Sequence, residues 1–377
     1  MKLGHLLAAA VAGAALTGAA HAQEAVRIGM ITTLSGPAGY LGQDVRDGFR
    51  LAMDNGKLSG VPVDLVIEDD GLKPGQGKQI ANKFMKSDGI KLITGLIFSN
   101  VASAVVPDVL EEGGIVVSAN AGPSEFAGKE CNANYYVMSW LTDTMQGSAG
   151  QNAEQLGFKR AFVLAPNYAA GKDAIAGFRR FFKGEVIGEI YTRLDQTDFA
   201  AELAQIRAAA PDVVFQFHPG GLGIAFVRQY QQFGLLGTIP MVVAEPSMDH
   251  AILKAVGDSA VGLNVSGHWN ADLDNAANKA FVASYTNAYG RPPTMYAAQG
   301  YDTARAIGAA LAETGGKVGD TKAFRTAMLK AKFESVRGAF AFGKNQHPVQ
   351  DWYAMKVEKG ADAAPTLKTT GTILKGY

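Results

Sequence analysis

The residues best placed to do chemistry lie in short loops that follow predicted strands. Ser99 and Asn100 follow one strand-like run and begin a helical pattern, and Asn120, Ala121 and Gly122 follow the next run. Free N–H groups at a helix start, together with a hydroxyl, suit a carboxylate because the peptide dipoles point at the anion. From spacing alone, an ordinary helix N-cap is an equally good interpretation of Ser99.

Three further candidates stand just past strand-like runs in the second half of the chain: Tyr168, His218 and Glu245. Tyr168 could stack on a ligand or hydrogen-bond to it, or be a half-buried rim tyrosine. His218 is either a ligand contact or a structural histidine. Glu245 could pair with a ligand ammonium or be a solvated loop acid, and spacing leaves all three alternatives open.

A nucleotide site is not indicated by the glycines of "SGPAGYLGQ". Gly36, Gly39 and Gly42 have the spacing G-x-x-G-x-x-G, whereas the dinucleotide fingerprint is G-x-G-x-x-G. Pro37 follows the first glycine, and no clear acidic ribose partner follows the second strand. We interpret these glycines as letting the loop pass close to a cleft while the next helix packs tightly.

Other catalytic signatures are also missing. In "GLKPGQGKQ", Gln79 stands where a phosphate loop needs Ser or Thr for magnesium, so we predict a helix start near Pro74. There is no G-x-S-x-G elbow, and Cys131 is the sole cysteine. The histidines considered as metal ligands are His218, His250, His268 and His347. They show no paired ligand spacing. We therefore expect a protein that is not an enzyme, with no catalytic residue, metal or cofactor.

The elements that must position these loops form two successive series. Short β-branched runs alternate with helical patterns, which predicts parallel strands with crossover helices. The first-series strands are expected at 26–33, 61–69, 91–95 and 114–120, and its helices at 42–55, 76–88 and 100–112. The second-series strands are expected at 160–166, 184–193, 212–219, 239–245 and 260–268, and its helices at 142–156, 171–182, 199–210, 221–233 and 248–256. Further helices are expected at 275–289, 295–314 and 322–332. Open sheets of this kind bind ligands at the carboxyl ends of their strands.

The first residues predict export. Lys2, an apolar stretch from Leu6 to Ala20 and a small-residue cleavage pattern indicate a signal peptide over residues 1–22. A membrane anchor is the alternative, but the stretch is shorter than the roughly 20 apolar residues that a span needs. We therefore expect a periplasmic protein without membrane insertion.

Charge and length narrow the classes further. Lys plus Arg equals Asp plus Glu at 35 each, which argues against nucleic acid or an anionic membrane as partner. The lone Cys131 allows no disulfide within the chain. About 355 residues after the signal exceed what one core usually supports, so two domains are expected.

Taken together, several segments resemble one known family. They are "LSGPAGYLGQDVRDGFRLA", "DGLKPGQGKQIANKF", "GLIFSNVASAVVPDVLEEGGIVVSANAGPSEF", "YAAGKDAIAGF" and "YAAQGYDTARAI". In this order they are similar to the branched-chain amino acid-binding family of type I periplasmic binding proteins. The resemblance implies an α/β fold of two Rossmann-like lobes with parallel sheets, joined by three hinge crossovers, with ligand in the cleft. We place the first lobe at 26–141 plus 269–345 and the second at 142–268 plus 346–377.

The resemblance also assigns roles to individual residues. Ser99 matches the family's carboxylate-binding serine, and Asn120, Ala121 and Gly122 match its backbone-and-hydroxyl cluster. Amino acid binders commonly have threonine at the last of these positions, so Gly122 argues against a conventional amino acid site. In the second lobe, Glu245 matches the ammonium-binding acid by order.

The tyrosine-glycine loop of the family matches Tyr168, although Ala169 replaces the usual glycine. The segment "NAGPSEFAGKECNANYY" resembles the branch associated with aromatic acids such as benzoate derivatives. Tyr40, Phe98 and Tyr168 would then supply ring contacts, although Phe98 could equally be a buried residue beneath the site. Further candidates are Tyr296 and Gln299, which are three residues apart on one helical face.

The resemblance thus predicts the substrate-binding component of an ABC importer. We expect a monomer that binds a small carboxylate, preferably an aromatic acid, and then engages a membrane permease with its ATPase. The alternatives are branched-chain or other hydrophobic amino acids for the same kind of importer, a ligand-sensing module without transport, and a secreted α/β enzyme.

Overall fold

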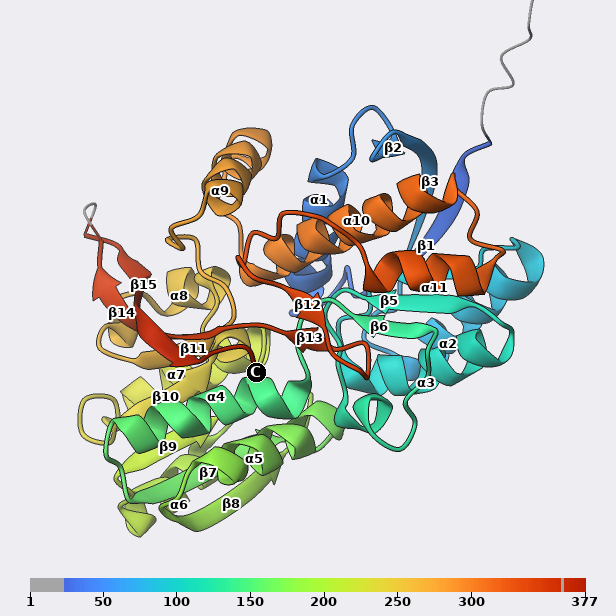
Figure 1. Ribbon diagram of the computed structural model, residues 1–377. Helices are drawn as coiled ribbons and strands as arrows, with labels where there is room; N and C mark the ends of the chain where they lie inside the picture. Colours follow the sequence, from blue (N-terminus) through green and yellow to red (C-terminus); the bar gives the residue numbers. More distant parts are fainter. Residues whose placement is uncertain (1–23, 361–362) are drawn as a thin grey trace, which may run out of the picture.

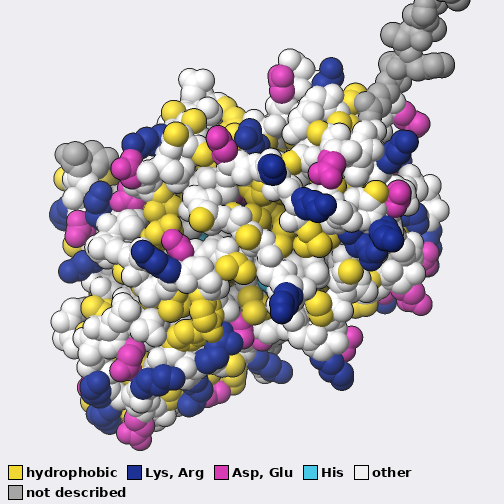
Figure 2. All heavy atoms as spheres, viewed as in Figure 1, with side chains coloured by type: hydrophobic (Ala, Val, Ile, Leu, Met, Phe, Trp, Pro, Cys, Tyr) yellow, Lys and Arg dark blue, Asp and Glu magenta, His cyan; other side chains and the backbone are white. Residues whose placement is uncertain are grey.

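The computed structural model describes residues 24–360 and 363–377 and shows two lobes side by side (Figure 1). The predicted signal peptide at 1–22 lies outside the described residues. Within the described part of the chain, no helix is long and apolar enough to cross a membrane. On the face shown in Figure 2, acidic and basic side chains are interspersed and hydrophobic side chains gather between the lobes.

The first lobe contains a six-stranded sheet in the order β2-β3-β1-β4-β5-β6. Its strands are β1 (Val26–Thr32), β2 (Lys57–Leu58), β3 (Val61–Asp69), β4 (Leu92–Thr94), β5 (Ile115–Ser118) and β6 (Tyr135–Val137). All pair in parallel except β2, which forms a short antiparallel hairpin with β3. The central strands β4 and β5 are entirely buried, as expected for a parallel sheet with both faces covered by helices.

Helices from two distant parts of the chain cover this sheet. They are α1 (Gly39–Leu51), α2 (Pro74–Asn82) with a π-helical extension η1 (Lys83–Ser87), α3 (Ser99–Glu111), the 3₁₀ turn η2 (Ser124–Ala127), α9 (Ala276–Tyr289), α10 (Met295–Thr314) and α11 (Thr321–Leu329). α1 and α10 cross closely, because a Cβ on Gly48 would lie 1.9 Å from the carbonyl oxygen of Ala297. Only glycine allows this approach.

The second lobe contains a seven-stranded sheet in the order β15-β14-β11-β10-β9-β7-β8. Its strands are β7 (Arg160–Pro166), β8 (Glu185–Thr192), β9 (Val213–Gln216), β10 (Met241–Ala244), β11 (Asn264–Gly267), β14 (Trp352–Lys359) and β15 (Pro365–Leu374). The helical segments around it are α4 (Thr142–Gln155), α5 (Ala169–Phe181), α6 (Ala200–Ala209), α7 (Gly221–Gln232), η3 (Glu245–Ser247), α8 (His250–Val256) and η4 (Gly257–Ala260).

The expected α/β class is confirmed, but the sheets are mixed rather than purely parallel. β14 runs antiparallel to β11, and β15 runs antiparallel to β14. The reason is the connection: the returning chain enters this sheet from the other lobe, and β14 joins β15 as a hairpin, which places antiparallel strands together.

The chain passes between the lobes three times, at 138–141, at 268–275 and in a long segment after α11. The last segment contains the small hairpin of β12 (Ala341–Phe342) and β13 (Pro348–Val349). The lobe boundaries expected after residues 141, 268 and 345 stay predictions. Hinge bending about them stays a prediction.

Candidate functional site

A space with about 360 Å³ free of atoms, part of it open to solvent, lies between the carboxyl ends of the two sheets. The lining residues are Leu41, Ile97, Phe98, Ser99, Asn120, Ala121, Trp140, Thr142, Met145, Tyr168, Ala170, Phe217, Pro219, Pro246 and Tyr296. Both lobes contribute, and none of these residues is Asp, Glu, Lys, Arg or His. We call this space the inner cavity.

Ser99 is the first residue of α3, and its side chain does not cap the helix. The N-cap position belongs to Phe98, with no side-chain capping bond. The Phe98 carbonyl accepts hydrogen bonds from the N–H groups of Val101 at 3.1 Å and Ala102 at 2.9 Å. Within the described part of the chain, the Ser99 hydroxyl makes no hydrogen bond, although the residue is only 3% exposed. The capping alternative therefore does not explain Ser99.

The loop after β5 is held rigidly by hydroxyl groups that donate to its carbonyls. The Ala121 carbonyl accepts from Ser118 Oγ at 2.6 Å and from the Tyr135 hydroxyl at 3.0 Å. The Asn120 carbonyl accepts from Ser139 Oγ at 2.5 Å. These bonds fix the backbone where Asn120 and Ala121 line the inner cavity.

Two N–H groups of this loop already donate hydrogen bonds within the protein. They are therefore not available to an anion, which differs from what the sequence led us to expect. Those of Asn120 and Ala121 donate to the Leu96 carbonyl at 3.3 and 2.9 Å. Gly122 does not line the inner cavity, and a Cβ there would lie 2.1 Å from the Trp140 carbonyl oxygen. Thr142 Oγ1 instead donates to the Gly122 carbonyl at 2.7 Å, and Thr142 lines the cavity.

Tyr168 supplies an aromatic wall from the second lobe. It is the N-cap residue of α5, and its ring lies nearly parallel to Phe217, with centroids 6.4 Å apart and planes inclined by 10°. Burial raises the pKa of the Tyr168 hydroxyl, which therefore stays protonated. Because Ala170 also lines the cavity, α3 and α5 both direct their amino ends towards it.

Glu245 lies behind the wall of the cavity rather than in it. Its Oε2 is 3.4 Å from His268 Nδ1, and this buried oxygen has no hydrogen-bond partner among the described residues. Burial raises the pKa of Glu245 well above its usual range, whereas it lowers the pKa of His268 well below its own. Burial therefore favours the neutral form of each group, and Glu245 does not line the cavity.

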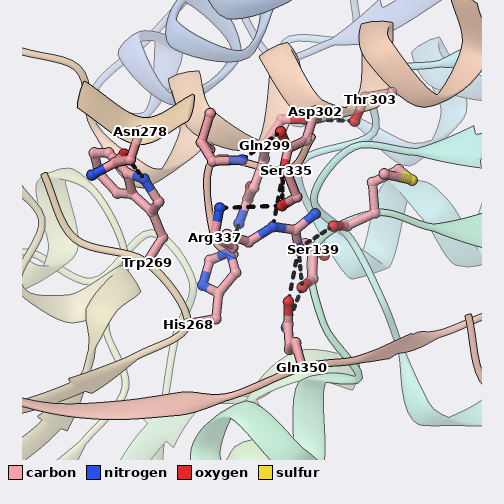
Figure 3. A network of polar contacts seen from close by, with 12 residues as sticks. Ser139, His268, Trp269, Asn278, Gln299, Asp302, Thr303, Ser335, Arg337 and Gln350 are labelled. Atoms are coloured by element: carbon pink, nitrogen blue, oxygen red, sulfur yellow. Dashed lines mark hydrogen bonds and ion pairs between the residues drawn. The ribbon is translucent and has the colours of Figure 1, made fainter. Parts of the chain in front are cut away.

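Gln299 belongs to the same cluster. Its Nε2 is 3.5 Å from His268 Nε2, so the side chain faces the histidine rather than the inner cavity (Figure 3). His218 also lies away from the cavity. Its ring nitrogens are 2.8 Å from Gln216 Oε1 and 3.1 Å from Thr192 Oγ1, and burial lowers its pKa to about 3. His218 matches the structural alternative.

Tyr40 joins the two lobes beside the cavity. Its hydroxyl donates to Asp249 Oδ2 at 2.7 Å, and Asp249 Oδ1 caps α8. Burial raises the pKa of Asp249 to about 6. Tyr296, at the start of α10, does line the inner cavity. Six of the predicted residues thus line it, namely Phe98, Ser99, Asn120, Ala121, Tyr168 and Tyr296.

The residues that sequence reasoning missed are mostly neighbours of those it selected. Phe217 and Pro219 flank His218, and Pro246 follows Glu245. At the end of a strand, successive side chains point to opposite sides. The pattern therefore indicated the correct loop, but the neighbouring side chain is the one that faces the cavity. Trp140 comes from the first crossover and Thr142 is the first residue of α4, and neither carried a recognisable signal.

A buried polar network ties the crossovers together behind the site (Figure 3). The Arg337 guanidinium is 3.0 Å from Asp302 Oδ2 on α10, and it donates to the Met138 carbonyl at 2.6 Å and to Gln350 Oε1 at 2.8 Å. Ser335 Oγ donates to the same Asp302 oxygen at 2.6 Å. The first and third crossovers are therefore joined to each other and to α10.

Two lobes that enclose a small cavity at facing strand ends define a two-lobed solute-binding protein. The profile of the family described as "Periplasmic binding protein" matches residues 25–362, and the chain belongs to this family. It is a family of solute-binding proteins of ABC transporters rather than of enzymes. Its members bind small ligands, work with a permease and an ATPase, and act in the periplasm.

Individual relatives agree with this assignment. A solute-binding protein of an ABC transporter from R. palustris in complex with benzoate is 29% identical, with a TM-score of 0.89 over 94% of this chain and 98% of that one. A second from the same organism, in complex with 4-hydroxybenzoate, is 27% identical, with a TM-score of 0.86 over 94% and 98%. "Leu/Ile/Val-binding protein homolog 6" of Brucella melitensis is 27% identical over 97% of this chain and 96% of its own length.

Proposed function

We propose that this solute-binding protein carries a small aromatic monocarboxylate, such as benzoate or a hydroxybenzoate, in the inner cavity. The observation that carries the proposal is the absence of ionisable acids and bases other than tyrosine from the described residues that line the cavity. A carboxylate can be held there by dipoles and hydroxyls, but an α-ammonium would be buried without a counter-charge.

The carboxylate would lie near the amino end of α3. Ser99 offers a hydroxyl, and it is the first residue of α3, so the amino end of this helix borders the cavity. A helix amino end attracts anions because its first N–H groups lack intrahelical partners. The amino end of α5 adds a second positive dipole end from the opposite lobe.

The ring would lie among flat and apolar side chains. Tyr168 and Phe217 present parallel rings, and Trp140, Phe98 and Tyr296 complete an aromatic lining. Aromatic side chains favour stacked or edge-on contacts with a ligand ring. The benzoate and 4-hydroxybenzoate named for two structural relatives support the same class.

Closure would follow from ligand contacts with both lobes. Because Ser99 and Tyr168 stand on opposite lobes, a ligand touching both favours the closed arrangement by that differential affinity. We propose that the chain is monomeric, reaches the periplasm through the segment at 1–22, and presents its closed lobes to the permease.

A branched-chain amino acid is the second candidate. The name "Leu/Ile/Val-binding protein homolog 6" favours it, and so does Asn120, whose buried Oδ1 has no hydrogen-bond partner among the described residues and could accept from an ammonium. A thermal-shift screen separates the two, because a ligand that binds only the folded protein raises its melting temperature. We expect benzoate and hydroxybenzoates to raise it and leucine, isoleucine and valine to leave it unchanged. The reverse pattern would refute the aromatic-acid proposal.

Transport itself needs a separate test, since a ligand-sensing module would give the same shifts. Uptake of radiolabelled benzoate by cells should fall when this chain is deleted and return with the wild-type gene. Unchanged uptake together with tight binding in vitro would favour sensing.

A further inference from the structure

A second and larger chamber lies beside the inner cavity, and we call it the outer chamber. It encloses about 1,380 Å³ of atom-free space that includes solvent at its mouth. Loops at the strand ends of both lobes form it, and its apolar residues include Leu72, Leu194, Leu222 and Ala225. Asp195 is its charged residue, and it is paired with Arg193 at 2.9 Å.

Two residues line both spaces, and they come from opposite lobes. Phe98 precedes α3 in the first lobe, and Pro219 precedes α7 in the second. Both are buried, with Phe98 only 3% exposed. The boundary between the inner cavity and the outer chamber is therefore assembled from two side chains that belong to different lobes.

The backbone holds both side chains in place. The Phe98 carbonyl is committed to the N–H groups of Val101 and Ala102, so the residue is fixed as the N-cap of α3. Pro219 is followed by Gly220, which has φ +65° and is the N-cap of α7. A Cβ placed on Gly220 would lie 3.5 Å from the Ala38 Cβ, so the lobes touch beside this boundary.

We propose that Phe98 and Pro219 form a partition that limits the length of the ligand. The inference rests on the proposed function, because it assumes that the inner cavity holds the acid. A single-ring acid stays on the inner-cavity side of the partition when the lobes close. A longer acid has to displace it to reach the apolar outer chamber, and a rigid, well-packed site resists such overpacking.

Calorimetric titration of the purified protein with benzoate, 4-propoxybenzoate and 4-phenylbutanoate tests the partition. The two long acids extend the molecule beyond the ring and between the ring and the carboxylate, respectively. We expect wild type to bind benzoate at least about tenfold more tightly than either long acid. In Phe98→Ala, the affinity for at least one long acid, relative to the affinity for benzoate, should rise by roughly tenfold or more. Each newly buried methylene group increases the binding constant about fourfold.

Filling the outer chamber provides the matched control. Phe98→Ala/Ala225→Trp should lose the gain for long acids, whereas Ala225→Trp alone should leave the benzoate affinity unchanged. If Phe98→Ala does not fold, Pro219→Ala serves from the opposite lobe and should shift the ratio in the same direction.

The outcomes separate the two proposals. If wild type binds no benzoate, the proposed function fails. If wild type binds benzoate but long acids bind equally well, or if opening the partition leaves the affinity ratio unchanged, the partition is refuted while the proposed function stands.

Discussion

The inner cavity and the crossover network lie close together, yet the network contains a buried ion pair and the cavity is lined by uncharged side chains. At the crossovers, Arg337 and Asp302 are buried as an ion pair, with carbonyls and amides around the guanidinium. The described residues lining the cavity include no such pair and offer hydroxyls and helix ends instead. At the crossovers, the protein itself supplies the buried charges. In the cavity, the buried charge would be the carboxylate of the bound ligand.

Removing the cation from the crossovers should have the largest effect. We expect Arg337→Met to lower the free energy of unfolding by about 3 to 5 kcal/mol, because Asp302 would keep a buried carboxylate without its partner. Urea unfolding followed by circular dichroism measures this. As a control, Lys279→Met breaks the exposed pair with Asp274 and should leave the unfolding midpoint in place. A wild-type midpoint for Arg337→Met would contradict the role of the network.

A pH-dependent effect should follow from Asp249, which accepts a hydrogen bond from Tyr40 of the other lobe. Burial raises its folded-state pKa to about 6, so its stabilising contribution is complete below about pH 4 and is lost as pH rises through 6. The groups that face it are Tyr40, Tyr296, Asp44 and Glu245.

Asp249→Asn removes the titration and still allows an N-cap on α8. The stability of wild type relative to this variant should fall by roughly 2 to 4 kcal/mol between pH 4 and pH 7. Urea unfolding of both proteins at each pH measures the difference. A difference that does not change with pH would contradict the raised pKa.

Within the cavity, Ser99 offers a sharper test of how the anion is held. Ser99→Ala should weaken benzoate binding by about 1 to 3 kcal/mol, because the carboxylate loses a hydroxyl donor. Ser103 is the matched control: it lies one turn later on α3 and donates to Glu125 at 2.5 Å. Ser103→Ala should bind as wild type does in the same titration, and an equal loss in both variants would remove Ser99 from the site.

The smallest effect is expected at Glu245. Since burial favours its neutral carboxyl and the side chain does not line the inner cavity, Glu245→Gln should change the benzoate affinity by no more than about 0.5 kcal/mol. Calorimetry again measures this. A large loss, above all of leucine binding, would restore Glu245 as an ammonium-binding acid.

The elements were predictable from sequence because their hydrophobic patterns are local. β3 and β7 occupy the predicted residues, and α10 does too. β15 was missed because its half-buried pattern ends the chain without a crossover helix, and α1 begins at Gly39 rather than 42 because glycines weaken the helical signal. Local patterns thus predict whether a helix or a strand is present better than they predict its first and last residues.

The site was predictable only to the level of its loops. Residues such as Ser99 and Tyr168 carry polar or aromatic groups at strand ends, which a pattern can detect. The direction of a side chain depends on tertiary packing, so Phe217 was overlooked beside His218. The crossover network was invisible because Met138, Asp302 and Arg337 are far apart in the sequence.

The most direct test compares acids that differ only by the α-amino group. Calorimetric titration with leucine against 4-methylpentanoate, and with phenylalanine against 3-phenylpropanoate, isolates the cost of burying an ammonium in the inner cavity. We expect each deaminated acid to bind at least about tenfold more tightly than its amino acid, in line with the cost of an unpaired buried charge. Tighter binding of leucine or phenylalanine than of its deaminated partner would contradict it.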